Sequence, residues 1–202
     1  RCTYHPDVPV SQGRAWLQEL RSLDITTLMV FDNDCHFWTA PDPWRDGVAR
    51  ARNAYGDIVS IFQCLNEPDA GWYPGTTETL EERAAHHPSS WVMSQADVTA
   101  HLWVARDFLG PVAIIIGPGL SSGHSEWAAG VGWRPVNMLG VHPYAKAPGS
   151  PELVALIAAY SAYGLPVAAT EYDATTVGMH TWMAKNMSVA WAFCWSNSMH
   201  PQ

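Results

Sequence analysis

The feature that most constrains the fold is an alternation of short apolar runs with segments of helical periodicity, which persists to the C-terminal region. Each apolar run ends abruptly in polar or aromatic residues, as residues 27–31 do before Asp32, Asn33 and Asp34. Strands that alternate with helices are expected to be parallel, because each helix returns the chain to the end of the sheet where the next strand begins. The sequence therefore predicts an α/β fold built on a parallel sheet.

Six strand segments and five helices are expected. The strands are predicted at residues 27–31, 58–65, 112–116, 138–141, 167–170 and 189–194, and the helices at residues 15–23, 44–55, 94–108, 126–131 and 151–163. The connection over residues 69–88 has no predicted element, and loops of that length in compact domains are usually functional or disordered. Its two aromatic residues, Trp72 and Tyr73, favour a binding function.

The strand ends distinguish two ways of arranging such a sheet. A doubly wound nucleotide-binding sheet normally carries a GxGxxG or GxxxxGK[ST] turn, and neither pattern occurs here. Polar groups after nearly every strand are instead typical of a TIM barrel, which builds one site from many loops. We therefore expect residues 1–202 to form one catalytic domain, a compact or N-terminally reduced (β/α)8 barrel. Its opening strands would be vestigial, missing or supplied by a second copy in a homodimer.

The charge balance narrows the class of partner. Eleven Lys and Arg against 19 Asp and Glu leave a formal net charge of −8, so the protein would repel nucleic acid. The longest uncharged apolar stretch, residues 110–120, is about half of the ~20 residues that a membrane-spanning helix needs, and no membrane span is expected.

The cysteines and histidines indicate neither a metal site nor a cofactor. No CxxC, HxH or HExxH spacing occurs in the sequence. Cys64 and Cys194 lie in apolar runs and are expected to be buried as small hydrophobic side chains. Cys2 and Cys35 flank predicted loops, and the sequence leaves open whether they form a disulfide.

Two glutamates stand out because each follows an apolar strand: Glu67 in the tripeptide Asn66-Glu67-Pro68, and Glu171 after residues 167–170. In a closed barrel both would point to one cleft at the carboxyl ends of the strands. Glycoside cleavage needs such a pair, one to protonate the leaving oxygen and one to attack the anomeric carbon or activate water. Either glutamate alone is equally explained as a polar residue where a strand meets solvent, whereas the pair favours glycoside chemistry.

These residues and their neighbours resemble the retaining glycoside hydrolases of clan A, the (β/α)8 enzymes that include cellulases, mannanases, xylanases and β-xylosidases. The resemblance covers about residues 28–197 and follows the order of the clan's motifs. It implies that Glu67, in the Asn-Glu-Pro that ends the clan's fourth strand, is the general acid/base. Glu171, at the end of the seventh strand, would be the nucleophile, and His142 and Tyr144 match the His-x-Tyr at the tip of the sixth strand.

The resemblance also implies how other residues would act. Tyr144 would hydrogen-bond the nucleophile, His142 would line the cleft, and Asn66 would bind the 2-hydroxyl of the sugar next to the cleaved bond. Trp195, at the end of the eighth strand, would form the floor of the sugar's subsite. A further group either contacts the same sugar or forms a capped, solvated turn: Asp32, Asn33, Asp34 and His36. The basic residue of the clan's second strand has no counterpart, and Arg14, on a predicted helix, is a poor substitute.

The chain contains eleven tryptophans, and aromatic rings pack well against the apolar faces of sugars. Those in or beside the predicted tip loops, together with one tyrosine, would either bind sugar or fill the space between helices and barrel: Trp38, Trp44, Trp72, Tyr73, Trp91 and Trp127. The remaining assignments are to the core: Trp16, Trp103, Trp182 and Trp191. Trp72 is the tryptophan of these loops that we place among the substrate-binding residues.

The sequence thus predicts an extracellular, secreted glycosidase that hydrolyses O-glycosyl bonds of β-linked oligosaccharides or polysaccharides by double displacement. A second hypothesis is a catalytically inactive carbohydrate-binding or adhesion module on the same barrel. A third, a metal hydrolase, is disfavoured by the missing ligand motifs. Residues 1–6 contain no secretory signal, and the sugar, the linkage and the endo or exo mode are not specified by the sequence.

Overall fold

The structure is a computed structural model that describes residues 2–31, 41–86, 92–121, 125–143, 147–173, 178–186 and 194–195. Its main sheet contains β1 (Cys2–Thr3), β2 (Leu28–Phe31), β3 (Ile61–Cys64), β4 (Ile114–Leu120), β5 (Met138–Val141) and β6 (Val167–Ala169). The helices are α1 (Val10–Ser22), α2 (Pro41–Tyr55), α3 (Leu80–His86), α4 (Gln95–Leu109), α5 (Ser125–Ala128), α6 (Pro151–Ser161) and α7 (Met179–Asn186). A second, two-stranded sheet pairs β7 (Tyr172–Asp173) with β8 (Cys194–Trp195) in parallel.

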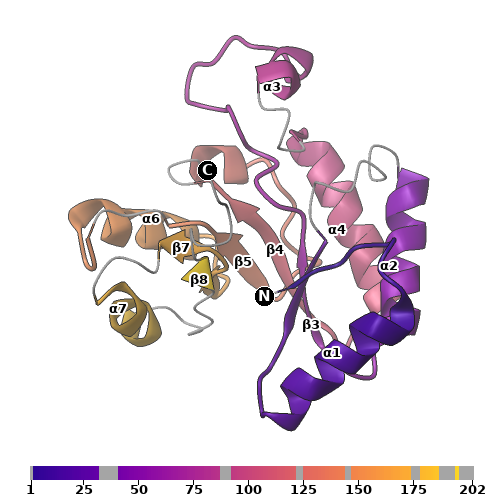
Figure 1. The fold of residues 1–202 in the computed structure, drawn as a ribbon. Coiled ribbons are helices and arrows are strands. Elements are labelled where there is room, and N and C mark those ends of the chain that lie inside the picture. The colour runs from indigo at the N-terminus through magenta and orange to yellow at the C-terminus, as the bar shows by residue number, and fades with distance from the viewer. Residues whose placement is uncertain are drawn as a thin grey trace.

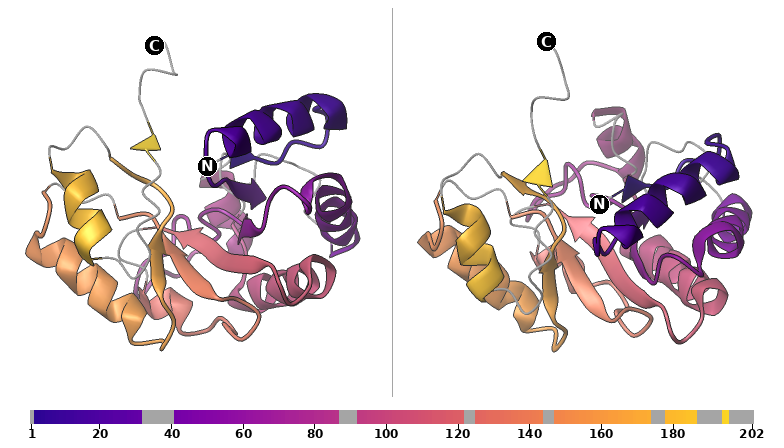
Figure 2. Two further views of the ribbon diagram at one scale, coloured as in Figure 1. Left: turned by 90° about the horizontal axis from the view of Figure 1, so that it is seen from below. Right: turned by 60° about the horizontal axis from the view of Figure 1, so that its bottom comes forward.

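The main sheet is parallel throughout, and each strand pairs with the next one along the chain, in the order β1-β2-β3-β4-β5-β6. In a doubly wound sheet this order reverses and helices cover both faces, whereas here it runs in one direction. Right-handed crossovers then place successive helices on one side of the sheet. Figures 1 and 2 show the result, an outer arc of helices around the strands, which is the arrangement of a TIM barrel.

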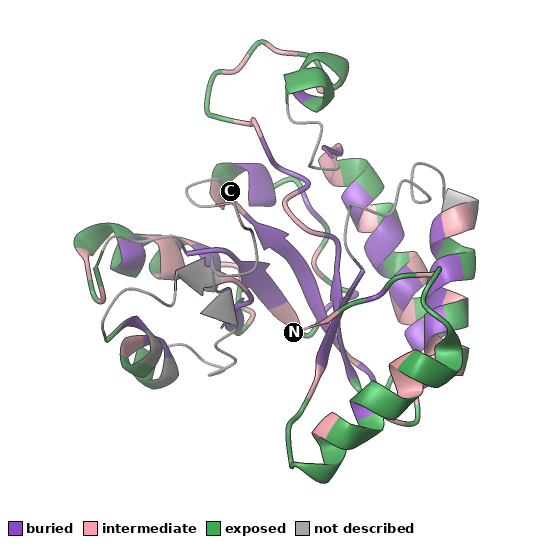
Figure 3. Cartoon of the chain, in the orientation of Figure 1, coloured by how far each residue is buried: buried purple, intermediate pink, exposed green. Residues whose placement is uncertain are grey.

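The strands β2 to β6 are buried almost throughout (Figure 3). Successive side chains of a strand point to opposite faces, so both faces of this part of the sheet are covered. One buried cluster combines side chains of the inner face: Leu28, Val30, Ile61, Ile116 and Ala168. The intervening residues of the strands, such as Met29, Phe31, Phe62 and Cys64, belong to the larger cluster that packs beneath the helices. Because side chains alternate between the two faces along each strand, the position of a residue in its strand decides whether its side chain points to the inner face of the sheet.

Several predicted elements are confirmed. The strand over residues 138–141 has the predicted bounds, and α4 begins after Ser94, whose hydroxyl accepts a hydrogen bond from the Asp97 backbone N–H at 3.1 Å. The predicted strand 58–65 is shortened at both ends. Residues 58 and 59 belong to the turn that ends α2, since their N–H groups donate to the Tyr55 carbonyl, and Leu65 leaves the extended conformation with φ of 73°.

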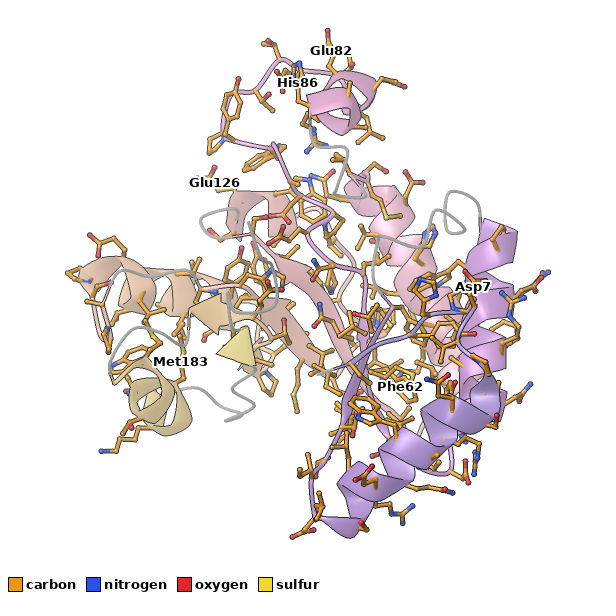
Figure 4. All side chains as sticks on the ribbon, viewed as in Figure 1. Asp7, Phe62, Glu82, His86, Glu126 and Met183 are labelled. Carbon is orange, nitrogen blue, oxygen red and sulfur yellow. The ribbon has the colours of Figure 1, made fainter. Side chains whose placement is uncertain are left out.

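The connection expected to be irregular over residues 69–88 contains α3, so that prediction was wrong in this part. A capping box begins the helix: the Glu82 N–H donates to the Thr79 hydroxyl at 3.2 Å, and the Thr79 N–H donates to Glu82 Oε2 at 2.7 Å. The sequence signal, Thr79 followed three residues later by Glu82, was present but not used. Figure 4 shows Glu82 and His86 on this helix, which stands beyond the sheet.

Two expectations for the tryptophans were wrong. Trp16 and Trp103 are 47% and 46% exposed rather than in the core, because they lie on the outer faces of α1 and α4. Trp44 and Trp127 are fully buried and fill the space between helices and sheet. Trp182 packs partly buried against the main core, while Trp38, Trp91 and Trp191 lie outside the described residues.

The cysteine expectations are partly answered. Cys64 is buried as predicted, and burial raises the pKa of its thiol. Cys2 lies in the two-residue strand β1, which pairs with Met29 and Val30, so a short strand does precede β2. Cys35 lies outside the described residues, as does the side chain of Cys194. In the described part of the chain, no helix combines the length and apolar character that a membrane crossing requires.

Arg14 joins α1 to the turn before β3 and does not lie at a strand end. Its guanidinium forms paired hydrogen bonds of 2.8 and 2.7 Å with the two carboxylate oxygens of Asp57. These bonds lower the pKa of Asp57 to about 2. Arg14 is therefore a fold-stabilising residue rather than a substitute for the basic residue of the clan's second strand.

This pair generates a pH-dependent prediction. The pKa of Asp57 is lower in the folded than in the unfolded chain, so the pair stabilises the fold above pH ~4 and loses its effect as the pH falls towards 2. We expect Asp57→Asn to lower the urea midpoint slightly at pH 7 and much less near pH 2, where about half of the Asp57 carboxyl groups of the folded protein are protonated. Arg14→Lys, which keeps the charge without the paired geometry, is the control. A midpoint difference that persists unchanged at pH 2 would contradict this account.

Candidate active site

The end of β3 carries Glu67 in an unusual backbone conformation. Leu65 and Glu67 have φ of 73° and 44°, in the left-handed region that side chains other than glycine rarely adopt. The conformation is held by hydrogen bonds to both neighbouring strands: the Leu65 N–H donates to the Phe31 carbonyl at 3.1 Å, and the Glu67 N–H donates to the Gly119 carbonyl at 2.8 Å. The backbone at Glu67 is therefore fixed at a defined height between β2 and β4.

A buried glutamine supports this turn from within the sheet. Gln63 is fully buried in β3, and its Nε2 donates to the Leu65 carbonyl at 3.0 Å and to Asn66 Oδ1 at 3.4 Å. Asn66 itself forms a parallel bridge with Gly119. Gln63 was not among the predicted site residues, although a glutamine inside an otherwise apolar strand is a usable signal.

The residues after Glu67 tie this loop to β4. Asp69 is fully buried, and the Ser121 N–H, just beyond β4, donates to both of its carboxylate oxygens at 3.1 Å. The Pro68 carbonyl accepts from the Met93 N–H at 2.9 Å, at the beginning of α4. Asp69 was not among the predicted site residues, and its role is to anchor the loop that carries Glu67.

His142 follows β5 and is fully buried. Its backbone N–H donates to the Leu120 carbonyl at 2.9 Å, which continues the pairing of β4 with β5 beyond the strand end. On the next strand, the Thr170 N–H donates to the Val141 carbonyl at 3.1 Å and so places Glu171 two residues beyond the end of β6. His142 and Glu171 therefore lie at the same edge of the sheet as Glu67.

The three side chains meet at this edge. His142 Nδ1 lies 2.8 Å from Glu67 Oε1, and His142 Nε2 lies 3.5 Å from Glu171 Oε2. One imidazole ring thus stands between two carboxyl groups that are far apart in the sequence. The side chains of Glu67 and Glu171 are 26% and 15% exposed, so both carboxyl groups remain partly open to solvent while the ring between them is closed off.

The other predicted site residues are placed only in part. Trp72 is partly buried and packs against the main core. Its backbone N–H donates to the Asp69 carbonyl at 3.0 Å, so Trp72 anchors the loop. Trp195 lies in β8, but its side chain is not described. Five predicted residues lie outside the described residues: Asp32, Asn33, Asp34, His36 and Tyr144. Within the described ranges, no group of three or more His, Cys, Asp or Glu is arranged to hold a metal ion.

Comparison with known proteins identifies the fold. Neither the protein-family models nor the curated protein sequences contain a match. Among solved structures, the chain is similar to a psychrophilic family 10 endo-β-1,4-xylanase, with a TM-score of 0.56, 15% identity and 89% of this chain covered. The fold is of the TIM-barrel type. The α/β barrel architecture predicted from the sequence is thereby confirmed, at the level of fold.

Two further solved structures support the same assignment of fold. A β-glycosidase gives a TM-score of 0.54 at 15% identity over 87% of this chain. A family 5 broad-specificity endoglucanase from Ruminococcus champanellensis, with bound cellotriose, gives 0.54 at 11% identity over 87%. The chain spans 65%, 61% and 60% of the lengths of these three enzymes.

The backbone at Glu67 generates a stability prediction. A residue with a Cβ atom in the left-handed region costs about 1–2 kcal/mol, and glycine escapes most of this cost. We therefore expect Glu67→Gly to be about 1 kcal/mol more stable than Glu67→Ala in urea denaturation. The same pair of substitutions at Glu19, in the last turn of α1, is the control, where glycine should be less stable than alanine by up to about 1 kcal/mol. The same rank order at both positions would contradict a strained backbone at Glu67.

Proposed function

We propose that this protein is a retaining glycoside hydrolase in which Glu171 is the nucleophile and Glu67 the general acid/base. The observation that carries the proposal is the contact of one buried imidazole, that of His142, with both carboxyl groups. It lies at the carboxyl ends of the strands, where TIM-barrel enzymes place their active sites. The solved structures with this fold that we compared are named as a xylanase, a β-glycosidase and an endoglucanase, which agrees with this chemistry.

The proposed reaction has two steps. In the first, a carboxylate oxygen of Glu171 attacks the anomeric carbon, the glycosidic C–O bond breaks, and the proton of Glu67 passes to the leaving oxygen. In the second, Glu67 takes a proton from water, whose oxygen attacks the same carbon and releases the Glu171 carboxylate. The two inversions together retain the anomeric configuration.

His142 suits this sequence because it touches both reacting groups. The contact of 2.8 Å between its Nδ1 and Glu67 Oε1 holds one proton, so the ring constrains the orientation of the acid/base carboxyl group. We assign the other oxygen of Glu67 to proton transfer with the leaving group. Retention requires the reacting carboxyl oxygens to lie ~5–5.5 Å apart, whereas inversion requires ~6.5–9.5 Å. Proton NMR of the first product anomer tests the choice.

Substitution of the two glutamates tests their different roles. Glu171→Ala removes the bond-forming group, so we expect loss of turnover with every glycoside. Glu67→Ala removes the proton donor, so kcat should fall by about 10²–10⁴-fold for poor leaving groups and much less for activated aryl glycosides, which leave without a proton. Glu19→Ala, on the exposed surface of α1, is the control. Equal losses for good and poor leaving groups in Glu67→Ala would contradict its assignment as the acid.

A second candidate function is a carbohydrate-binding or adhesion module without turnover. The exposed ring of Tyr73 favours it, because a sugar can pack on an aromatic ring without any reacting group. The two candidates are separated by one measurement. Glycan binding by calorimetry without any product from the same glycan would support the module, and product that depends on Glu171 would exclude it.

The loop that follows Glu67 supports a glycan chain as the substrate. Residues 70–86 form an arm that begins with two hydrogen-bonded turns. In the first, the Trp72 backbone N–H donates to the Asp69 carbonyl. In the second, the Thr76 N–H donates to the Tyr73 carbonyl across Pro74 and Gly75, whose φ is 85°. The base of the arm is closed by Arg83, which donates to the Ala70 carbonyl. Tyr73 is 52% exposed, so the arm presents an aromatic ring on a rigid turn.

The charge of the arm favours neutral sugars. Within residues 70–86 the acidic side chains are Glu78, Glu81 and Glu82, and Arg83 is buried. An acidic arm repels uronic acid units, so we propose a neutral β-linked oligosaccharide or polysaccharide as substrate. We also propose an extracellular place of action, since a polymeric glycan is too large to cross a membrane.

Tyr73 provides a test of chain binding. A sugar that packs on its ring gains about 0.5–1.5 kcal/mol, so we expect Tyr73→Ala to raise KM for a long oligosaccharide by roughly 2- to 10-fold. An aryl glycoside of one sugar, which is too short to reach the arm, should be hydrolysed as before. Tyr73→Trp keeps an aromatic face and should keep KM low. An unchanged KM for the long substrate in Tyr73→Ala would contradict chain binding by the arm.

A further inference from the structure

Gly119 lies at the centre of the contacts that hold the candidate site. It belongs to β4, after a register shift between Ile116 and Gly119 in the pairing with β5. The shift is a bulge formed by Gly117 and Pro118, and proline is tolerated in a strand interior mainly at such irregularities. The bulge brings Gly119 opposite Asn66, with which it forms the bridge described above.

The backbone of Gly119 fixes Glu67. Its carbonyl accepts the Glu67 N–H at 2.8 Å. This bond holds a residue whose φ of 44° would otherwise relax towards a more populated region. The position of the Glu67 backbone is therefore set by Gly119.

The missing side chain of Gly119 makes room for His142. A Cβ atom built on Gly119 would lie 2.1 Å from His142 Nε2 and 2.8 Å from both Cδ2 and Cε1 of the same ring. These separations are far below van der Waals contact, so the imidazole and a Cβ atom cannot occupy this space together. The ring of His142 lies directly against the Gly119 backbone.

The ring has little freedom to move away without losing its contacts. His142 is fully buried, and its own backbone is bonded to Leu120, the residue after Gly119. On the facing strand, a Cβ atom on Gly140 would lie 2.7 Å from the Gly117 carbonyl oxygen and 2.9 Å from that of Pro118. The backbones of β4 and β5 thus approach each other closely next to the His142 ring.

We propose that Gly119 is a positioning residue of the reaction, which sets the contact between His142 Nδ1 and the acid/base carboxyl group of Glu67. This inference rests on the proposed function, because it takes Glu67 as the proton donor. Gly119 acts twice: its carbonyl fixes the Glu67 backbone, and its absent side chain admits the ring that orients the Glu67 carboxyl group. No part of Gly119 touches the reacting atoms.

A double-substitution cycle tests the proposal. Gly119→Ala displaces the ring, so kcat for a poor leaving group should fall by about 10²-fold, with a much smaller fall for an activated aryl glycoside. His142→Ala removes the ring and leaves space for the new methyl group. Gly119→Ala should therefore cause little further loss in the His142→Ala background, because the two substitutions are coupled.

The same cycle measured by urea denaturation gives a second readout that needs no activity. We expect Gly119→Ala to lower the urea midpoint of the otherwise unchanged protein and to leave that of His142→Ala nearly unchanged. If Gly119→Ala alone does not fold while the double variant does, that result also supports the steric part of the proposal. The control is Gly132→Ala, whose Cβ would lie 2.8 Å from Thr99 Cγ2 rather than against His142, and whose leaving-group dependence should match the unchanged protein.

Two results would overturn the proposal, and they differ from failure of the proposed function. Equal losses for good and poor leaving groups in Gly119→Ala would show a general effect on folding. Equal effects of Gly119→Ala with and without His142 would show that the ring is not what the methyl group displaces. By contrast, turnover that is unaffected by Glu171→Ala would overturn the proposed function itself.

Discussion

The candidate site depends on the parallel pairing of consecutive strands, which delivers the carboxyl ends of β3, β5 and β6 to one edge of the sheet. Backbone hydrogen bonds continue this pairing past the strand ends, from Glu67 to Gly119 and from Thr170 to Val141. They set the heights at which the side chains emerge. A single imidazole can therefore reach two carboxyl groups that come from distant parts of the chain. The order of the strands in the sheet brings the three side chains of the candidate site together.

The same edge of the sheet holds backbone strain and unsatisfied polar atoms. Leu65 and Glu67 occupy the left-handed region, and Gln63 Oε1 and Thr170 Oγ1, both buried, have no hydrogen-bond partner among the described residues. Each such feature costs on the order of 1–3 kcal/mol. All four lie on β3 or β6 and the residues that follow them, the segments that carry Glu67 and Glu171. Stability is lowered on the segments that hold the two proposed catalytic groups, and this supports the proposal of a functional site at this edge.

The sequence predicted those parts of the fold for which local pattern and tertiary structure agree. The strand over residues 138–141 combines an apolar run with a polar end, and α4 has both a cap and a glycine stop, so their bounds were predicted closely. The start of β3 was missed because residues 58 and 59 are apolar, like a strand, while their N–H groups complete the end of α2. In the arm after Glu67, a capping box was present, but the glycines, threonines and aromatic residues around it led to the prediction of an irregular loop.

The residues of the candidate site could be predicted from their type and from their position after a strand. Glu67, His142 and Glu171 each follow an apolar run, and a parallel sheet must bring such positions together. Gly119 was not predictable in this way, because the need for glycine depends on which atom occupies the space of its Cβ, and that atom belongs to the next strand. The pairing of β4 with β5, which brings Gly119 and His142 together, is shifted by a bulge. The only sequence feature that indicates this bulge is a proline inside an apolar strand. The ring nitrogen that crowds Gly119 is the one that faces Glu171, so a methyl group at this position would disturb both carboxyl contacts of His142 through one atom.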